Sequence, residues 1–336
     1  MNKITCAVFG FGKMGYIHVN ALTKMENVLK VIVIEIDPIK RDSAVQMHRK
    51  VVAYANLSDC FNAERSIDYI TISTPSRFHF VHVMECMNHH LNILVEKPFV
   101  TEREHGLSLI DKSLDYTQLI GVGFIERYNS AIRKARSIIK QGAIGNPIEI
   151  HTRRWSLLPS SPDVGVVLDL ASHDIDICRF LIDQEYSDVF ARAIGGQNGL
   201  ETSAIISGRT TEGILINNSV SWGSTSKLRE IFVIGARGTL KIDTSISELT
   251  INRTSKPIVG FEGLKYILGE NATVSSTIDH EKVEPIITEH SIFQNALNNN
   301  NKVDIITLLE AQKSLNVIDC VYLSLINNEI VKIDNS

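Results

Sequence analysis

The sequence contains few cysteines, no long apolar run and no excess of basic residues. Its 5 cysteines are scattered, odd in number and form no Cys-x-x-Cys pair, which argues against a disulfide framework and against a structural zinc site. No stretch approaches the ~18–20 consecutive apolar residues that a membrane-spanning helix needs. Lys and Arg number 34 against 38 Asp and Glu, a net charge of −4, so we expect neither a nucleic-acid nor a membrane partner. The sequence therefore predicts a cytoplasmic protein with free thiols and no bound metal.

The composition is that of an ordinary globular protein, with 44% hydrophobic and 21% charged residues. Because domains usually contain ~100–200 residues, a chain of 336 residues is expected to form two. We place the first domain at residues 1–124 and the second at residues 125–336. The last helix is a candidate to pack back on the first domain.

In the first domain, short apolar runs alternate with segments of helical periodicity. The runs show little polar alternation, which is typical of parallel strands covered on both faces. The predicted strands are Ile4–Phe9, Lys30–Ile36, Ile67–Ser73, Asn92–Val95 and Leu119–Gly123, and the predicted helices are Met14–Met25, Pro38–Met47, Arg77–Asn88 and Thr101–Ser113. This order predicts an α/β fold, a doubly wound parallel sheet with right-handed crossovers.

The second domain has a different pattern. Alternating apolar and polar residues between turns at Glu212-Gly213 and Arg237-Gly238 predict antiparallel strands. Val166–Ile182 has helical periodicity, and Phe261–Glu284 lacks a pattern and is expected to be a loop. We therefore expect an α+β domain here.

A glycine motif follows the first predicted strand and opens the first predicted helix. It reads Gly10-Phe11-Gly12-Lys13-Met14-Gly15, which in this context is the fingerprint of a dinucleotide-binding turn. Gly10 would permit the turn, Gly12 would let the backbone approach a pyrophosphate, and Gly15 would allow close helix–strand packing. The helix N-terminus would offer N–H groups to the phosphates. We expect residues 10 and 12–15 to contact the cofactor.

Two acidic residues near the end of the second strand favour NAD over NADP. Asp37 is placed to accept hydrogen bonds from the ribose hydroxyls, and Glu35 is the substitute candidate. Two carboxylates there would repel a 2′-phosphate. Lys13, Lys40 and Arg41 leave the alternative open, because each could pair with a 2′-phosphate.

Three further motifs appear in order along the chain: Ser73-Thr74-Pro75, Ile93-Leu94-Val95-Glu96-Lys97-Pro98, and Asp169-x-x-x-His173-Asp174-Ile175-Asp176. Together with the glycine motif, they resemble the glucose–fructose oxidoreductase / inositol dehydrogenase (Gfo/Idh/MocA) family. The resemblance implies an N-terminal Rossmann domain that binds a nicotinamide cofactor. It also implies a C-terminal domain with an open, mostly antiparallel sheet, and oxidation of secondary hydroxyls of sugars and cyclitols.

Lys97, Asp169 and His173 are the candidate catalytic residues. Lys97 follows a buried strand at the edge where α/β sheets place their ligands, and similar proteins often have a cis bond before the following proline. Asp169 and His173 are four residues apart, so on a helix the carboxylate could orient the imidazole. The alternatives are an ion pair between Glu96 and Lys97, and Asp169 as a helix cap beside a structural His173. The family match favours the catalytic reading.

The remaining site candidates follow from the resemblance. Thr74, Pro75, His79 and Glu96 are expected near the cofactor. Substrate-binding residues are expected to be Lys97, Arg127, Tyr128, Arg153, Arg154, Trp155 and His173. The motif Arg153-Arg154-Trp155, followed later by Trp222-x4-Lys227-Leu228-Arg229-Glu230, resembles UDP-N-acetylglucosamine 3-dehydrogenases, which implies oxidation of a nucleotide-activated amino sugar, with C3 as the expected carbon. Arg153, Arg154, Lys227 and Arg229 could supply charge for a diphosphate, and solvated strand or loop charges are the alternative.

Two alternatives remain for the function. One is a myo-inositol or free-sugar dehydrogenase, and the other is a non-catalytic regulator that senses NAD or sugar. In similar proteins the large second sheet often makes a subunit interface, so the resemblance implies a homo-oligomer, either a dimer or a tetramer.

Overall fold

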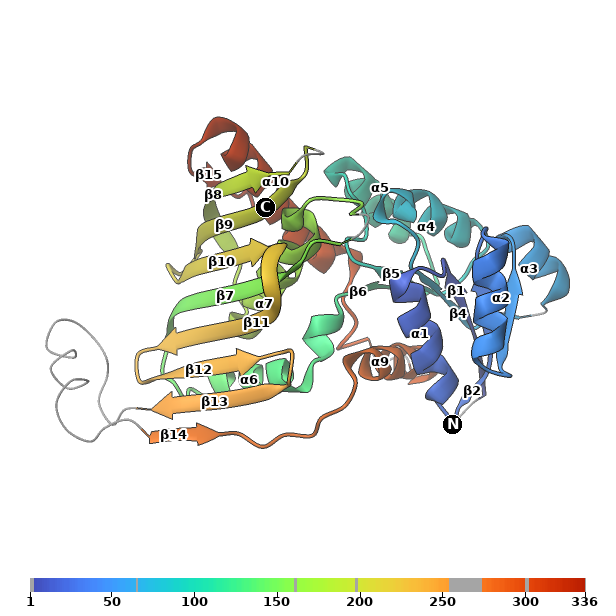
Figure 1. Cartoon of the computed structure of the whole chain (residues 1–336), viewed down its shortest axis with the longest axis horizontal. Coiled ribbons are helices and arrows are strands. Elements are labelled where there is room, and N and C mark those ends of the chain that lie inside the picture. Colours follow the sequence, from blue (N-terminus) through green and yellow to red (C-terminus); the bar gives the residue numbers. More distant parts are fainter. Residues whose placement is uncertain are drawn as a thin grey trace, which may run out of the picture. The chain divides into compact units, whose positions relative to one another are not determined.

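The computed structural model describes residues 3–64, 66–159, 162–196, 199–253, 274–299 and 302–335. The chain divides into two compact units (Figure 1). The first comprises Met1–Ile125 and Glu284–Gln312, and the second comprises Glu126–Val283 and Lys313–Ser336. The C-terminal helix that lies wholly in the first unit is α9 (Pro285–Asn299), whereas the last helix, α10 (Leu308–Asn327), belongs to the second unit from Lys313 onward.

The described residues of the first unit form a six-stranded parallel sheet in the order β3-β2-β1-β4-β5-β6. Its strands are β1 (Ile4–Phe9), β2 (Val28–Ile34), β3 (Val51–Tyr54), β4 (Tyr69–Ile72), β5 (Ile93–Glu96) and β6 (Ile120–Gly123). This order reverses direction between β1 and β4, and ligands bind at the carboxyl ends of the strands at such a switch point. The predicted doubly wound parallel sheet is confirmed.

Helices connect these strands. They are α1 (Lys13–Lys24), α2 (Pro38–Met47), α3 (Leu57–Ala63), the 3-10 turn η1 (Ser76–Phe78), α4 (His79–Asn88) and α5 (Arg103–Ser113). The helix α9 packs beside α1 (Figure 1). Its Phe293 and Ala296 join the apolar core of the sheet, which also includes Val8, Val31 and Leu94. The α9 segment therefore contributes to the core of the first unit.

The second unit contains a nine-stranded mixed sheet in the order β14-β13-β12-β11-β7-β10-β9-β8-β15. Its strands are β7 (Pro147–Leu157), β8 (Tyr186–Gly195), β9 (Glu201–Thr210), β10 (Leu215–Ser221), β11 (Gly223–Gly235), β12 (Gly238–Asp243), β13 (Glu248–Arg253), β14 (Val274–Thr277) and β15 (Val331–Lys332). The pairs are antiparallel except for β7 and β10, which run parallel. The predicted mostly antiparallel sheet is confirmed.

The second unit also contains the 3-10 turn η2 (Ile125–Tyr128, from Glu126 onward), α6 (Ser130–Lys140), the π-helical turn η3 (Val167–Ala171) and α7 (Ser172–Ile182). The segment Phe261–Glu284, expected to be a loop, lies outside the described residues up to position 273, and Val274–Thr277 forms β14 instead. In the described part of the chain, no helix is long and apolar enough to cross a membrane.

Candidate functional site

The glycine motif forms a tight turn between β1 and α1. Gly10 has φ +94°, and a Cβ atom there would stand 2.8 Å from the backbone nitrogen of Thr74. A Cβ atom on Gly15 would stand 2.0 Å from the carbonyl oxygen of Gly10. Gly12 is different, because a Cβ atom there would meet nothing within 4 Å. Gly10 and Gly15 are therefore required by the fold, while Gly12 leaves open space at the N-terminus of α1 for a phosphate group.

Glu35 and Asp37 have different surroundings at the end of β2. Glu35 is buried and accepts hydrogen bonds from the backbone N–H groups of Phe11 (2.7 Å) and Asp37 (3.0 Å). Its carboxylate thus fastens the glycine turn to β2, which makes it a poor candidate for a ribose contact. Asp37 caps α2 by accepting from Ile39 N at 2.9 Å through Oδ1. Asp37 remains the candidate that faces the ribose.

Thr74 and His79 connect the ends of β4 and β5. Ser73 Oγ donates to the Gly10 carbonyl at 3.0 Å, which holds the end of β4 against the glycine turn. The buried His79 places Nε2 2.8 Å from the Thr74 carbonyl oxygen and Nδ1 2.8 Å from the Pro98 carbonyl oxygen. Both ring nitrogens thus contact backbone carbonyls. His79 thus holds the two strand ends together, and its place near the cofactor stays a prediction.

Lys97 is half-buried directly after β5, and its peptide bond to Pro98 is cis. The preceding residue, Glu96, is 4% exposed and places Oε1 2.9 Å from Nε2 of the buried His18 on α1. The side chain of Glu96 thus contacts the interior of the first unit, and its place near the cofactor stays a prediction.

Asp169 and His173 lie in the second unit on consecutive elements. Asp169 belongs to the π-helical turn η3, and His173 is in the first turn of α7, with both side chains half-buried. The prediction assumed a continuous α-helix over Val166–Ile182, and the wider π turn replaces its first part. Such turns occur frequently at functional sites. The roles of Asp169 and His173 remain predictions.

Arg153 and Arg154 are neighbours on β7 and so point to opposite faces of the sheet. Arg154 is 2% exposed and donates to Asp174 at 2.7 Å and to Glu126 at 2.9 Å. Arg153 is more exposed and donates to Glu230 at 2.5 Å. The two arginines therefore do not form one cationic patch, contrary to the sequence-based grouping.

Glu126 is the centre of the buried charge cluster in the second unit. Its Oε1 accepts from Arg154 and also from Arg229 at 2.8 Å. Burial opposes the charged carboxylate, but the two guanidinium groups outweigh it and lower the pKa of Glu126. Burial raises the pKa of Asp174, which contacts only Arg154 of these two arginines. The charges of Arg154 and Arg229 are thus compensated inside the protein.

The other predicted substrate residues of the second unit are also held by its structure. Arg127 makes two bonds to Asp176, of 2.7 and 2.6 Å. Tyr128 is 3% exposed, and the Trp155 indole donates to Ser219 at 3.0 Å. These contacts do not test substrate binding, which stays a prediction for all three.

Sequence reasoning missed several organising residues, namely His18, Glu126, Glu289 and His290, and it assigned Glu35 a different role. Their partners are far away in the chain, as with His18 and His290, so no local spacing marks them. Glu35 and Glu289 are charged residues within otherwise apolar segments. That pattern was the one signal in the sequence that could have indicated a role inside the fold.

The glycine turn predicts a contrast between two alanine variants. Gly15→Ala should lower the free energy of unfolding by about 3 kcal/mol, because its Cβ atom would overlap the Gly10 carbonyl. Gly12→Ala should leave stability within ~0.5 kcal/mol but weaken dinucleotide binding about tenfold, since its Cβ would occupy the phosphate approach. Urea unfolding and titration of NADH fluorescence measure both effects. Unchanged NADH affinity in Gly12→Ala would contradict the assignment.

His82 on α4 predicts a pH effect. Its Nδ1 lies 2.9 Å from Thr74 Oγ1, and burial, together with His79, lowers the pKa of His82 from 6.5 to about 4. Between these values the unfolded chain binds the proton and the folded chain does not, so acid favours unfolding. The wild type should therefore lose stability relative to His82→Gln as the pH falls from 6.5 toward 4. Urea unfolding at several pH values tests this, and a pH-independent difference would refute it.

Comparison with known proteins agrees with this architecture. Residues 4–133 match the family model described as "Oxidoreductase family, NAD-binding Rossmann fold", and residues 132–241 match the "GFO/IDH/MocA C-terminal domain". Among curated proteins, inositol 2-dehydrogenase 1 of Mycolicibacterium vanbaalenii is 29% identical over 190 residues, which is 55% of each chain. The chain thus spans about half the length of the curated relatives it matches.

Two solved structures share the fold over nearly the whole chain. UDP-N-acetylglucosamine 3-dehydrogenase from Acidithiobacillus ferrooxidans has a TM-score of 0.82 at 20% identity and covers 97% of this chain and 98% of its own. Levoglucosan dehydrogenase in complex with NADH and levoglucosan has a TM-score of 0.86 at 17% identity, covering 99% and 100%. With both family models matched in order over more than half of its length, the chain belongs to the Gfo/Idh/MocA oxidoreductase family.

Proposed function

We propose that this protein oxidises a secondary hydroxyl group of a sugar or cyclitol, with NAD as the hydride acceptor. The observation that carries the proposal is the placement of Lys97 in the NAD-binding unit. Lys97 follows β5, which pairs with β4, and the end of β4 packs against the glycine turn. This edge is where the reacting end of a dinucleotide bound at the turn would be held, so its place supports a role for Lys97.

The side chains supply the proton chemistry of such a reaction. NAD held by the glycine turn (Gly10–Gly15) and Asp37 would supply the hydride acceptor for the carbinol carbon, and loss of the hydroxyl proton to a base would balance the reaction as a ketone, NADH and a proton. Lys97 would hydrogen-bond the reacting oxygen, and His173 would take its proton. Asp169 would orient the imidazole of His173.

NAD is proposed over NADP because of the end of β2. Asp37 caps α2 there, so a carboxylate is fixed where a 2′-phosphate would lie. One of the three competing cations, Arg41, is turned to the backbone and donates from Nη1 to the carbonyls of Glu35 and Ile36, both at 2.8 Å. Its charge is therefore directed toward the strand end by these bonds.

An uncharged polyol is the substrate class that the side-chain contacts favour. The argument for a nucleotide sugar rested on cations for a diphosphate, and Arg153, Arg154 and Arg229 are paired with glutamates in the second unit. Curated relatives named as inositol dehydrogenases support the same choice. A UDP-activated amino sugar, oxidised at C3, is the second candidate because of the structural likeness to a UDP-N-acetylglucosamine 3-dehydrogenase.

The decisive experiment measures NADH formation over inositols, free sugars and UDP-sugars. We expect turnover with a cyclitol or free sugar and with NAD in preference to NADP. Turnover only with UDP-N-acetylglucosamine would favour the second candidate. NAD binding without turnover on any of these substrates would indicate a sensor in place of an enzyme.

Lys97→Met tests the role of Lys97 in this reaction. It should retain NADH binding and lose roughly 10²–10⁴-fold in kcat, the usual contribution of a positioned proton-transfer group. Lys112→Met, an exposed lysine on α5, should behave as the wild type. Full turnover in Lys97→Met would refute the assignment.

The protein is further proposed to form a homo-oligomer through one face of the nine-stranded sheet. On this face Arg192, Ile205, Ser219 and Arg153 lie in register across four strands. Ile205 and Ile194 are 64% and 69% exposed, beside a concavity of about 550 Å³ that both residues line. Exposed apolar residues around a concave surface are typical of subunit interfaces.

The interface predicts an effect on oligomeric state. Ile205→Asp should shift the protein toward monomer in size-exclusion chromatography with light scattering, because it would put a charged carboxylate where the interface buries an apolar side chain, at a cost in desolvation. Leu114→Asp, an equally drastic change at a residue 78% exposed in the first unit, should leave the oligomer intact. A monomeric wild type would overturn the proposal.

A further inference from the structure

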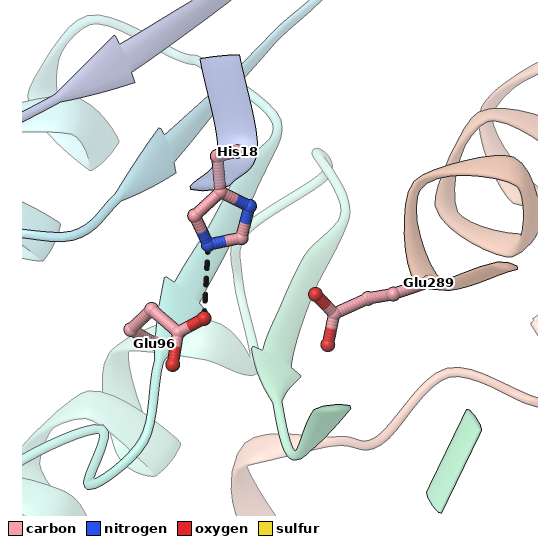
Figure 2. Close-up of side chains that lie close together, drawn as sticks. All are labelled: His18, Glu96 and Glu289. Atoms are coloured by element: carbon pink, nitrogen blue, oxygen red, sulfur yellow. Dashed lines mark hydrogen bonds and ion pairs between the residues drawn. The ribbon is translucent and has the colours of Figure 1, made fainter. Parts of the chain in front are cut away.

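Three side chains from separate elements meet in the interior of the first unit. His18 comes from α1, Glu96 from the end of β5, and Glu289 from α9, and their exposed fractions are 0%, 4% and 1%. One ligand atom of each residue lies within 4.8 Å of the others. Figure 2 shows the Glu289 carboxylate directed toward the His18 ring and the Glu96 carboxylate. Such convergence is unusual for buried acidic groups, which repel each other.

Glu289 is the residue that the protein leaves uncompensated. Among the residues that the structure describes, neither of its carboxylate oxygens has a hydrogen-bond partner, although both are buried. Burial, reinforced by Glu96, raises the pKa of Glu289 well above its usual range. Even a protonated carboxyl group would still lack a partner here, and an unsatisfied buried polar group is costly. The cluster therefore lacks a group that would contact the Glu289 oxygens.

The ring of His18 is held in place from its other side. Its Nδ1 lies 3.0 Å from His290 Nε2, and His290 Nδ1 lies 3.0 Å from the Tyr69 hydroxyl. The amide of Gln294 donates to the same hydroxyl at 3.1 Å. With Nδ1–H donating to His290, the lone pair of His18 Nε2 would point into the cluster. Metal-binding histidines are oriented by such outer hydrogen bonds.

We propose that His18 Nε2, Glu96 and Glu289 bind one divalent transition-metal ion, of the class of Zn²⁺ or Mn²⁺. One imidazole and two carboxylates are a ligand set that these ions accept, whereas Mg²⁺ and Ca²⁺ prefer oxygen alone. The charge of the ion would balance the two carboxylates. Ligands about 2.0–2.2 Å from one ion lie at most about 4.4 Å apart. A ligand atom up to 4.8 Å from the others would therefore have to move inward to bind the same ion.

The ion would link parts of the chain that are distant in sequence. It would join the helix that follows the glycine turn, the strand that ends before Lys97, and the α9 segment that returns from the C-terminal half. Its role would be structural, because all three ligands are buried. The inference is independent of the substrate and of the hydride transfer proposed above.

The test uses the purified full-length protein without cofactor or substrate. Elemental analysis before and after dialysis against EDTA gives the metal content, and we expect about one equivalent before dialysis. Chelated protein should regain at least about 5 °C in Tm after prolonged incubation with Zn²⁺ or Mn²⁺, and not with Mg²⁺. The absence of metal in the wild type, together with no rise in Tm on adding Zn²⁺ or Mn²⁺, would overturn the proposal.

Glu289→Gln distinguishes the ion from a simple proton. This variant keeps the shape of the side chain and removes its charge, so it should lose the bound metal and the rise in Tm. Glu284→Gln is the matched control, since Glu284 is exposed just before α9 and pairs with Lys24. It should respond to metal as the wild type does. If Glu289→Gln keeps the wild-type response, the site is wrong, and the wild-type measurement stands even if this variant fails to fold.

Discussion

The close approach of the ends of β1 and β4 is the constraint on which the cofactor end of the first unit depends. Only a residue without a side chain fits at Gly10, because a Cβ atom there would overlap the backbone of Thr74. Ser73 reinforces the approach by donating to the Gly10 carbonyl. From Thr74, His79 extends the connection to the Pro98 carbonyl, next to Lys97. The dinucleotide turn and the candidate catalytic lysine are thus joined within one unit by the Ser73 and His79 side chains, which contact backbone carbonyls.

The sequence predicted most of this sheet because buried parallel strands need continuous apolar runs. The predicted bounds of β1 and α2 match the observed bounds. The strand β3 escaped detection because it has only four residues, Val51–Tyr54, and lies at the edge of the sheet. The π turn at Val167–Ala171 also escaped, since its sequence keeps helical periodicity and only the hydrogen-bond register differs. Short or edge elements and changes of register carry little periodic signal.

The residue types at the site were easier to predict than their orientation. Glycines, Asp37 and Lys97 stand where the motifs placed them, because strand ends fix their backbone positions. Whether a side chain faces a ligand or the interior depends on distant partners, and the spacing within a motif does not contain that information. Arg154 illustrates this, since its partner Glu126 is 28 residues away and Glu126 also binds Arg229, which is 103 residues from it. The sequence therefore shows that a cationic residue is present, but not whether its charge is already paired with an acidic residue inside the protein.

Buried carboxylates organise both units, and the groups that surround them differ. Glu35 accepts two backbone N–H groups, Glu96 contacts His18, and Glu126 accepts from two guanidinium groups. Each such acid links segments far apart in the sequence, so its compensation is part of the fold. Glu289 is also buried and stands beside a second carboxylate, but within the described part of the chain it has no donor. Glu35 and Glu126 each have N–H donors of their own, whereas Glu96 and Glu289 lie beside a single imidazole, so we expect a positive species between these two carboxylates.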